Sequence, residues 1–159
     1  LGICFPHVVA HSFGGRVAVK CLSRADIFDR AVLTGCAGIV PKRTLGYRLR
    51  VKAYRAVRTV APRYAERHFG SAEYRQLPPL MRESYKKIVN EDLRGDAANI
   101  ARPVLFVCGS ADTETPLASA RIYHACVKGS RLFVMEGCGH FAHLENPLAF
   151  NAAAEEFLR

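Results

Sequence analysis

Four short runs of apolar residues, rich in β-branched and aromatic side chains, punctuate the chain. A serine or a glycine follows each run within two residues, and continuous apolar runs of this length predict strands buried on both faces of a sheet. The four runs are HVVA at 7–10, RAVLT at 30–34, VLFVC at 104–108 and RLFVM at 131–135.

Helical patterns separate these runs. Residues 14–22 form one predicted helix. Two later helices have clear start signals, because Thr115 and Asn146 can act as N-caps and each is followed by a proline, which fits the first helical position. The helix after Thr115 is expected to end near 128–129. The apolar faces expected to be buried are Val17, Ala18 and Cys21 in the first helix and Phe150, Ala154 and Phe157 in the last.

Short strands that alternate with helices predict an α/β fold, in which helices flank both faces of a parallel sheet. The alternation stops between Pro41 and Ile100, where the pattern is helical and polar. We therefore expect 1–40 and 101–159 to build the core and 41–100 to form a helical lid. The apolar residues at helical spacing in this insertion are Leu49, Ala53, Val57 and Val60.

The net charge of +9 comes almost entirely from one segment. Nine Lys or Arg and one acid, Glu66, lie between Pro41 and His68, so this segment supplies +8 of the +9. The simplest interpretation is a solvated helix face, and attraction of acidic substrates or of an anionic membrane surface is the sharper alternative. Nucleic acid is not expected as a partner, because no recognised binding module accompanies the charge.

The six cysteines form no CxxC pair and no Cys/His spacing that suits zinc. We expect free thiols in a reducing compartment, and hence a cytoplasmic protein. No apolar run is long enough to predict a transmembrane helix, and no signal peptide is visible at the start. The chain begins with Leu1 instead of Met, which is consistent with a fragment that has lost a targeting segment.

The sharpest chemical signal is Ser12 within VVAHSFGG. A strand, a tight turn built as small-x-Ser-x-Gly and a helix form a nucleophile elbow, which projects a serine hydroxyl from the sheet. Ala10 and Gly14 supply the small residues, and the Phe13 amide at the start of the helix could stabilise an oxyanion. The alternative is a loop or helix-capping serine, which is the commoner role for an isolated match.

Two further candidates follow later strands. Asp112 comes after VLFVC, at the carboxyl end of a strand, where an acid could orient a histidine. Otherwise it is a turn residue bound to its own backbone, and Glu114 is its nearest competitor. His140 follows RLFVM within GCGH and could accept the serine proton, with His143 as its competitor.

With these motifs the sequence resembles the α/β-hydrolase superfamily, which also has the order Ser, Asp, His. The matching segments are VVAHSFGGRVAV, PVLFVCGSADTETP, GCGHFAHLENPLAF and, for the lid, SAEYRQLPPLMRESYKKIVNEDL. The resemblance covers nearly the whole chain and implies that Ser12, Asp112 and His140 fill the triad positions. It also implies that the four strands are strands five to eight of an eight-stranded sheet.

Strands one to four and the oxyanion loop after strand three have no match in this chain, so the resemblance implies that the second oxyanion donor is absent. We therefore expect the chain by itself to be weakly active. The expected function is hydrolysis of carboxylic esters or related acyl compounds through an acyl-enzyme, on a small-molecule substrate and without metal or organic cofactor. The alternatives are acyl transfer, cofactor-free perhydrolase chemistry, and a non-catalytic receptor or scaffold that kept the fold.

Overall fold

The computed structural model describes residues 4–40, 45–61 and 78–159. The chain divides into two compact units. One, the core unit, combines Leu1–Ile39 with Asp92–Arg159, and the other, the helical unit, is Val40–Glu91. The assignment of residues 41–100 to a lid stays a prediction.

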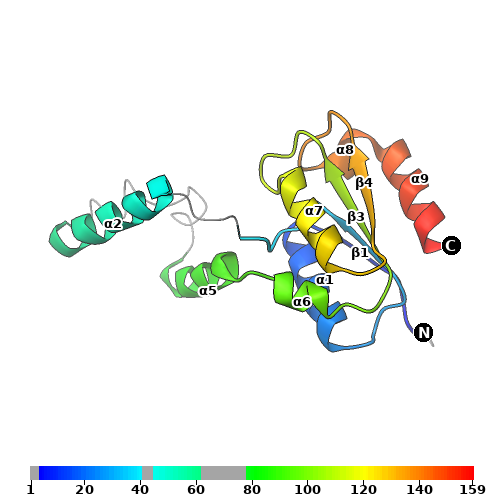
Figure 1. Cartoon of the computed structure of the whole chain (residues 1–159), viewed down its shortest axis with the longest axis horizontal. Helices are drawn as coiled ribbons and strands as arrows, with labels where there is room; N and C mark the ends of the chain where they lie inside the picture. The colour runs from blue at the N-terminus through cyan, green and yellow to red at the C-terminus, as the bar shows by residue number, and fades with distance from the viewer. Residues whose placement is uncertain (1–3, 41–44, 62–77) are drawn as a thin grey trace. The chain divides into compact units, whose positions relative to one another are not determined.

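A parallel sheet of four strands, in the order β1-β2-β3-β4, forms the centre of the core unit (Figure 1). The predicted α/β architecture, a parallel sheet with flanking helices, is confirmed. Every residue of β2 and β3 is buried, as their uninterrupted apolar runs predict, whereas Val9 of the edge strand β1 is 55% exposed. The strands are β1 (Val8–His11), β2 (Ala31–Thr34), β3 (Val104–Gly109) and β4 (Arg131–Met135).

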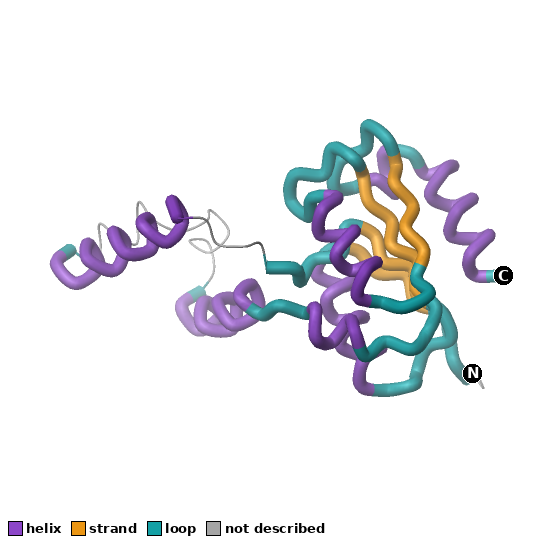
Figure 2. The backbone as a smooth tube through the Cα atoms, in the orientation of Figure 1, coloured by secondary structure: helices purple, strands orange, loops and turns teal. Residues whose placement is uncertain are grey.

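Helices cover both faces of this sheet (Figure 2). Successive strand residues point to opposite faces, so Leu33 of β2 packs into one apolar cluster and Val32 into the other. Helices α1 (Phe13–Arg24), α6 (Arg94–Ala98) and α7 (Leu117–Cys126) contribute to the first cluster. Helices α8 (Ala142–Glu145) and α9 (Pro147–Leu158) contribute to the second.

The buried face of α1 differs from the prediction. Gly15, Ala18, Val19 and Leu22 face the core, a stripe with the i, i+3, i+4, i+7 spacing of a packed helix. Of the predicted face, Ala18 is buried, whereas Val17 is 48% exposed and Cys21 is only partly buried, so the prediction was wrong for Val17. The direction in which the helix leaves the turn at Ser12 sets which stripe meets the sheet, and a short sequence with apolar residues on several sides does not reveal it.

The start of α7 also differs from the prediction, whereas that of α9 agrees. Pro116 is the N-cap residue of α7, so the expected N-cap at Thr115 was wrong; the Thr115 hydroxyl binds Asp112 instead. At α9 the Asn146 side chain accepts a hydrogen bond from the Ala149 amide, as predicted, at 3.2 Å. The predicted apolar face of α9 is buried.

The helical unit contains α2 (Leu45–Val60) and α5 (Pro79–Asn90). The described residues between 41 and 100 contain no strand, which agrees with the predicted helical character. Two of the apolar residues at helical spacing in α2 are exposed to solvent, since Leu49 is 66% exposed and Val60 is 87% exposed. Part of the basic segment at 41–68 lies outside the described residues.

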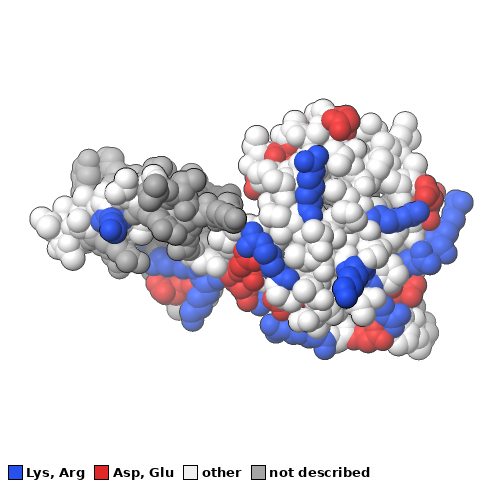
Figure 3. All heavy atoms as spheres, viewed as in Figure 1, with Lys and Arg blue, Asp and Glu red and all other residues white. Residues whose placement is uncertain are grey.

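Basic and acidic side chains are mixed on the visible face of the core unit (Figure 3). On the face shown in Figure 3, basic and acidic side chains of this unit are interspersed and form no patch of one sign. All six cysteines are free thiols, as expected, and Cys36, Cys108 and Cys138 are buried. Within the described residues, no helix is long and apolar enough to cross a membrane.

Candidate active site

Ser12 occupies a strained turn between β1 and α1. Its backbone has φ 50° and ψ −112°, a conformation that non-glycine residues adopt at a cost of about 1–3 kcal/mol. The flanking structure holds it there, because the Ser12 amide donates to the Thr34 carbonyl at 3.0 Å and the Ser12 carbonyl accepts from the Ala37 amide at 3.2 Å. The turn sets the serine at the carboxyl ends of the strands, as the elbow motif predicts.

The small residues around the turn do not contribute equally. A β-carbon on Gly14 would lie 3.7 Å from the Ala10 β-carbon, which is ordinary contact, so a methyl group fits there. A β-carbon on Gly15 would lie only 2.8 Å from the Cys36 sulfur. The tight approach is therefore at Gly15, one residue further on than the motif suggests.

The three predicted site residues are joined by hydrogen bonds in series. His140 Nε2 lies 3.0 Å from Ser12 Oγ, and His140 Nδ1 lies 2.9 Å from Asp112 Oδ2. Each residue follows a different strand: Ser12 follows β1, Asp112 follows β3 and His140 follows β4. Because the carboxyl ends of parallel strands meet at one edge of the sheet, residues far apart in sequence converge there.

Neither competing residue takes the place of Asp112 or His140 in this series of hydrogen bonds. Glu114 Oε2 is 3.5 Å from His140 Nε2, and its side chain is 65% exposed, in contrast to the fully buried Asp112 side chain. His143 does not reach the serine position; its ring lies beside His11, with the ring centroids 4.8 Å apart. In the structure the series of hydrogen bonds therefore runs through Asp112 and His140.

Asp112 is buried and densely hydrogen bonded. Its Oδ1 accepts from the amides of Glu114 and Thr115, both at 2.9 Å, and its Oδ2 accepts from the Thr115 hydroxyl at 2.7 Å as well as facing His140. Burial by itself would raise the pKa of Asp112, but hydrogen bonds from His140, Thr115 and Glu114 outweigh it and lower the pKa below its ordinary value. The carboxylate is therefore both a turn residue and the partner of His140.

Thr115 is a residue that the sequence reasoning missed in this role. Its amide and its hydroxyl bind the two different oxygens of Asp112, and its hydroxyl also lies 3.3 Å from His140 Nδ1. An Asp followed by a hydroxyl residue three positions later is a turn signal, so the pattern was visible in the sequence. Because Pro116 follows it, the sequence favours a helix N-cap at Thr115 over a bond to Asp112.

Glycines admit the histidine loop to the site. A β-carbon on Gly109, at the end of β3, would lie 2.1 Å from the Cys138 carbonyl oxygen, so only glycine lets the two backbones pass this closely. Gly35, at φ 52°, lies under the His140 ring, where a β-carbon would be 3.2 Å from the ring atoms. The loop itself is fixed by a hydrogen bond of 2.8 Å from the Gly139 amide to Glu145 Oε2.

The Phe13 amide begins α1 directly beside Ser12, as the sequence predicted. Amides in the first turn of a helix have no partner within the helix, so they can bind a developing negative charge. Among the described residues, no group of three or more His, Cys, Asp or Glu side chains could hold a metal ion.

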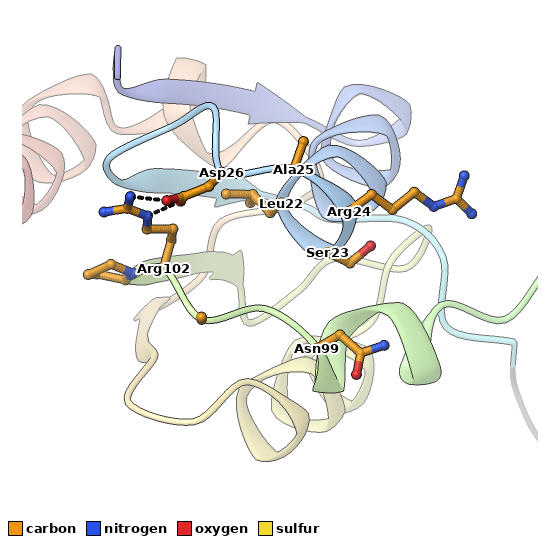
Figure 4. A pocket seen from close by; sticks show the side chains of 9 residues that line it. Leu22, Ser23, Arg24, Ala25, Asp26, Asn99 and Arg102 are labelled. Atoms are coloured by element: carbon orange, nitrogen blue, oxygen red, sulfur yellow. Dashed lines mark hydrogen bonds and ion pairs between the residues drawn. The ribbon is translucent and has the colours of Figure 1, made fainter. Parts of the chain in front are cut away.

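A separate hollow of about 530 Å³ lies away from this site (Figure 4). Its lining comes from the end of α1 and from the segment before β3, and thus from the amino ends of the strands. Asp26 and Arg102 form an ion pair at its rim, as Figure 4 shows. These charges bind each other, so the hollow offers no unpaired charge of theirs to a ligand.

Comparison with known proteins places this chain in a family. Residues 2–153 match the model of a family described as the alpha/beta hydrolase family. An uncharacterized protein of Mycobacterium tuberculosis is 24% identical over an alignment of 189 positions. The alignment covers 95% of this chain and 55% of the relative. A pimeloyl-(acyl-carrier protein) methyl ester esterase of Neisseria meningitidis is 35% identical over 81 residues, which cover 51% of this chain and 32% of the relative.

The fold is also that of solved hydrolases. A hydrolase from Pseudomonas aeruginosa superposes with a TM-score of 0.67 at 23% identity, covering 97% of this chain and 64% of that structure. The chain spans only part of the proteins that it matches, which is 55% of the length in the case of the mycobacterial relative. Because the family match extends over nearly all of its residues, this chain belongs to the alpha/beta hydrolase family.

Proposed function

We propose that this chain carries the catalytic residues of a serine-dependent hydrolase of carboxylic esters or related acyl compounds. Ser12 attacks the acyl carbonyl, and His140 takes the serine proton and passes it to the leaving alcohol. Water then gives a proton to His140 while its oxygen attacks the acyl carbon. The bond from this carbon to Ser12 Oγ breaks, the acid leaves, and His140 returns the proton to Ser12. Asp112 holds the imidazole in the required tautomer and stabilises its charged form.

The observation that carries this proposal is the unbroken series of hydrogen bonds from Ser12 through His140 to Asp112. The distances of 3.0 Å and 2.9 Å are those expected of a nucleophile, its base and the acid that orients the base. The strained backbone at Ser12 supports the same reading, since strain of this kind clusters at reactive sites. The Phe13 amide, in the first turn of α1, would donate to the oxyanion.

Ester substrates are the class that the comparisons favour, because the Neisseria meningitidis relative is described as a methyl ester esterase. Acyl transfer and perhydrolysis would pass through the same acyl-enzyme and differ only in the acceptor that resolves it.

The proposal is tested by turnover of p-nitrophenyl esters of rising acyl length in the full gene product. Ser12→Ala should lower kcat/KM by several orders of magnitude, because the members of such a triad act as a unit. Ser23→Ala, which makes the same change at the far end of α1, serves as the matched control and should retain the wild-type rate. Retained turnover in a folded Ser12→Ala protein would show that another group is the nucleophile.

A further inference from the structure

Three histidine rings gather at the carboxyl end of the sheet. His11 is the last residue of β1, and its ring centroid lies 4.7 Å from that of His140 and 4.8 Å from that of His143. The proposed mechanism uses only His140. His11 immediately precedes Ser12 in sequence, so its side chain starts from the same turn as the nucleophile.

His11 binds the backbone of the histidine loop. Its Nε2 lies 3.1 Å from the carbonyl oxygen of His140, a residue 129 positions away. A carbonyl oxygen can only accept, so His11 must donate its Nε2–H, and this bond fixes the proton on that nitrogen. The elbow and the loop that carries His140 are thereby joined directly.

The other supports of His140 come from different strands. Asp112, after β3, holds the ring through Nδ1, and Gly35, after β2, lies against the ring and the carbonyl oxygen. Among the described residues, His11 donates the hydrogen bond to the His140 carbonyl. Without it, the backbone of the loop loses its hydrogen bond to the residue that precedes Ser12.

His11 is itself held in place by its neighbours. The centroid of the Phe141 ring lies 5.0 Å from that of His11, and the His143 ring also contacts His11. His143 Nδ1 is buried and has no partner among the described residues. Burial lowers the pKa of His143, and the nearby His11 and His140 lower it further, which favours the neutral form of the ring that packs against His11.

We propose that His11 is a positioning residue, which acts through its hydrogen bond to the His140 carbonyl and holds the base at reacting distance from Ser12. This proposal rests on the proposed function and assigns His11 no contact with substrate. A misplacement of about 1 Å at a reacting group can cost about 100-fold in rate, so a loosened loop should lower kcat more than it raises KM.

The test compares His11→Met with His11→Gln in the full gene product. The two side chains have similar length, but only glutamine retains a donor near the position of Nε2. Met should lower kcat by about 10- to 100-fold with KM changed by less than about threefold, and Gln should recover most of the loss. His7→Gln, at a half-exposed histidine outside the cluster, is the control and should match the wild type.

Two outcomes separate this proposal from the proposed function. If Ser12→Ala abolishes turnover but folded His11→Met keeps the wild-type kcat, only the positioning role fails. If Ser12→Ala retains turnover, the proposed function fails first. Nitrogen-15 NMR of the wild-type protein adds a test that needs no variant, and it should find His11 protonated on Nε2; a His11 protonated only on Nδ1 would overturn the proposal.

Discussion

Replacement of Thr115 by valine removes one hydrogen bond from a buried carboxylate and keeps the shape of the side chain. Thr115 donates its hydroxyl to Asp112 Oδ2 at 2.7 Å, and the Asp112 side chain is fully buried. A hydrogen bond to a charged group contributes about 1.5–3 kcal/mol. Thr115→Val should therefore lower the free energy of unfolding by about that amount at pH 7, whereas Thr115→Ser, which keeps the hydroxyl, should lose less than about 1 kcal/mol.

The pH dependence of this loss has a definite sign. Because the pKa of Asp112 is lowered in the folded state, its ionised form adds stability above the unfolded value of about 3.9, and that stability is lost as the pH falls through the folded value. Removing the Thr115 hydroxyl moves the folded pKa back toward the ordinary value. The difference between the valine variant and wild type should thus be full at pH 7 and shrink below about pH 4.

Urea unfolding of wild type, Thr115→Val and Thr115→Ser at pH 7 and at about pH 3, below the unfolded pKa of the carboxyl, measures both effects. Equal stability of the valine and serine variants at pH 7 would refute the role given to the hydroxyl. A valine variant whose deficit grew as the pH fell would refute the sign of the linkage.

Three further predictions follow from the packing. Gly15→Ala should lower the free energy of unfolding by about 1–3 kcal/mol, because its methyl group meets the Cys36 sulfur, whereas Gly14→Ala should lower it less. Thermal unfolding compares the two variants, and equal losses of stability would contradict the close approach of Gly15 to Cys36. Asn146→Ala should cost about 1 kcal/mol through loss of the N-cap of α9, and an unchanged melting temperature would argue against the cap. Burial raises the pKa of Cys36 to about 12, so iodoacetamide at pH 8 should alkylate Cys36 far more slowly than the exposed Cys4. Mass spectrometry of the native protein measures the two rates, and equal rates would contradict this prediction.

The strands, and the meeting of the three candidate site residues, could be predicted because their signals are local. Each strand is a short apolar run that ends at a glycine or near a serine, and Ser12, Asp112 and His140 each follow one of these runs. Parallel pairing then brings the ends of the strands together without further information. The competitors Glu114 and His143 could be set aside only when the burial and distances were known.

Most of the features that were missed depend on long-range geometry. The sequence does not reveal that His11 reaches a carbonyl 129 residues away. The bond from the Thr115 hydroxyl to Asp112 is the local exception, because its turn pattern is visible in the sequence. The face of α1 depends on the angle at which the helix leaves Ser12. Short α8 lacks the length that makes a helical period visible.

The central claim is that Ser12 is an activated nucleophile, and the site of covalent labelling tests it most directly. The full gene product is treated with a fluorophosphonate, digested, and analysed by mass spectrometry to locate the modified residue. We expect rapid labelling on Ser12, and much slower labelling in His140→Ala, because the imidazole 3.0 Å from the hydroxyl accepts its proton. Labelling at another residue such as Cys138, or no labelling of a folded and intact protein, would contradict it.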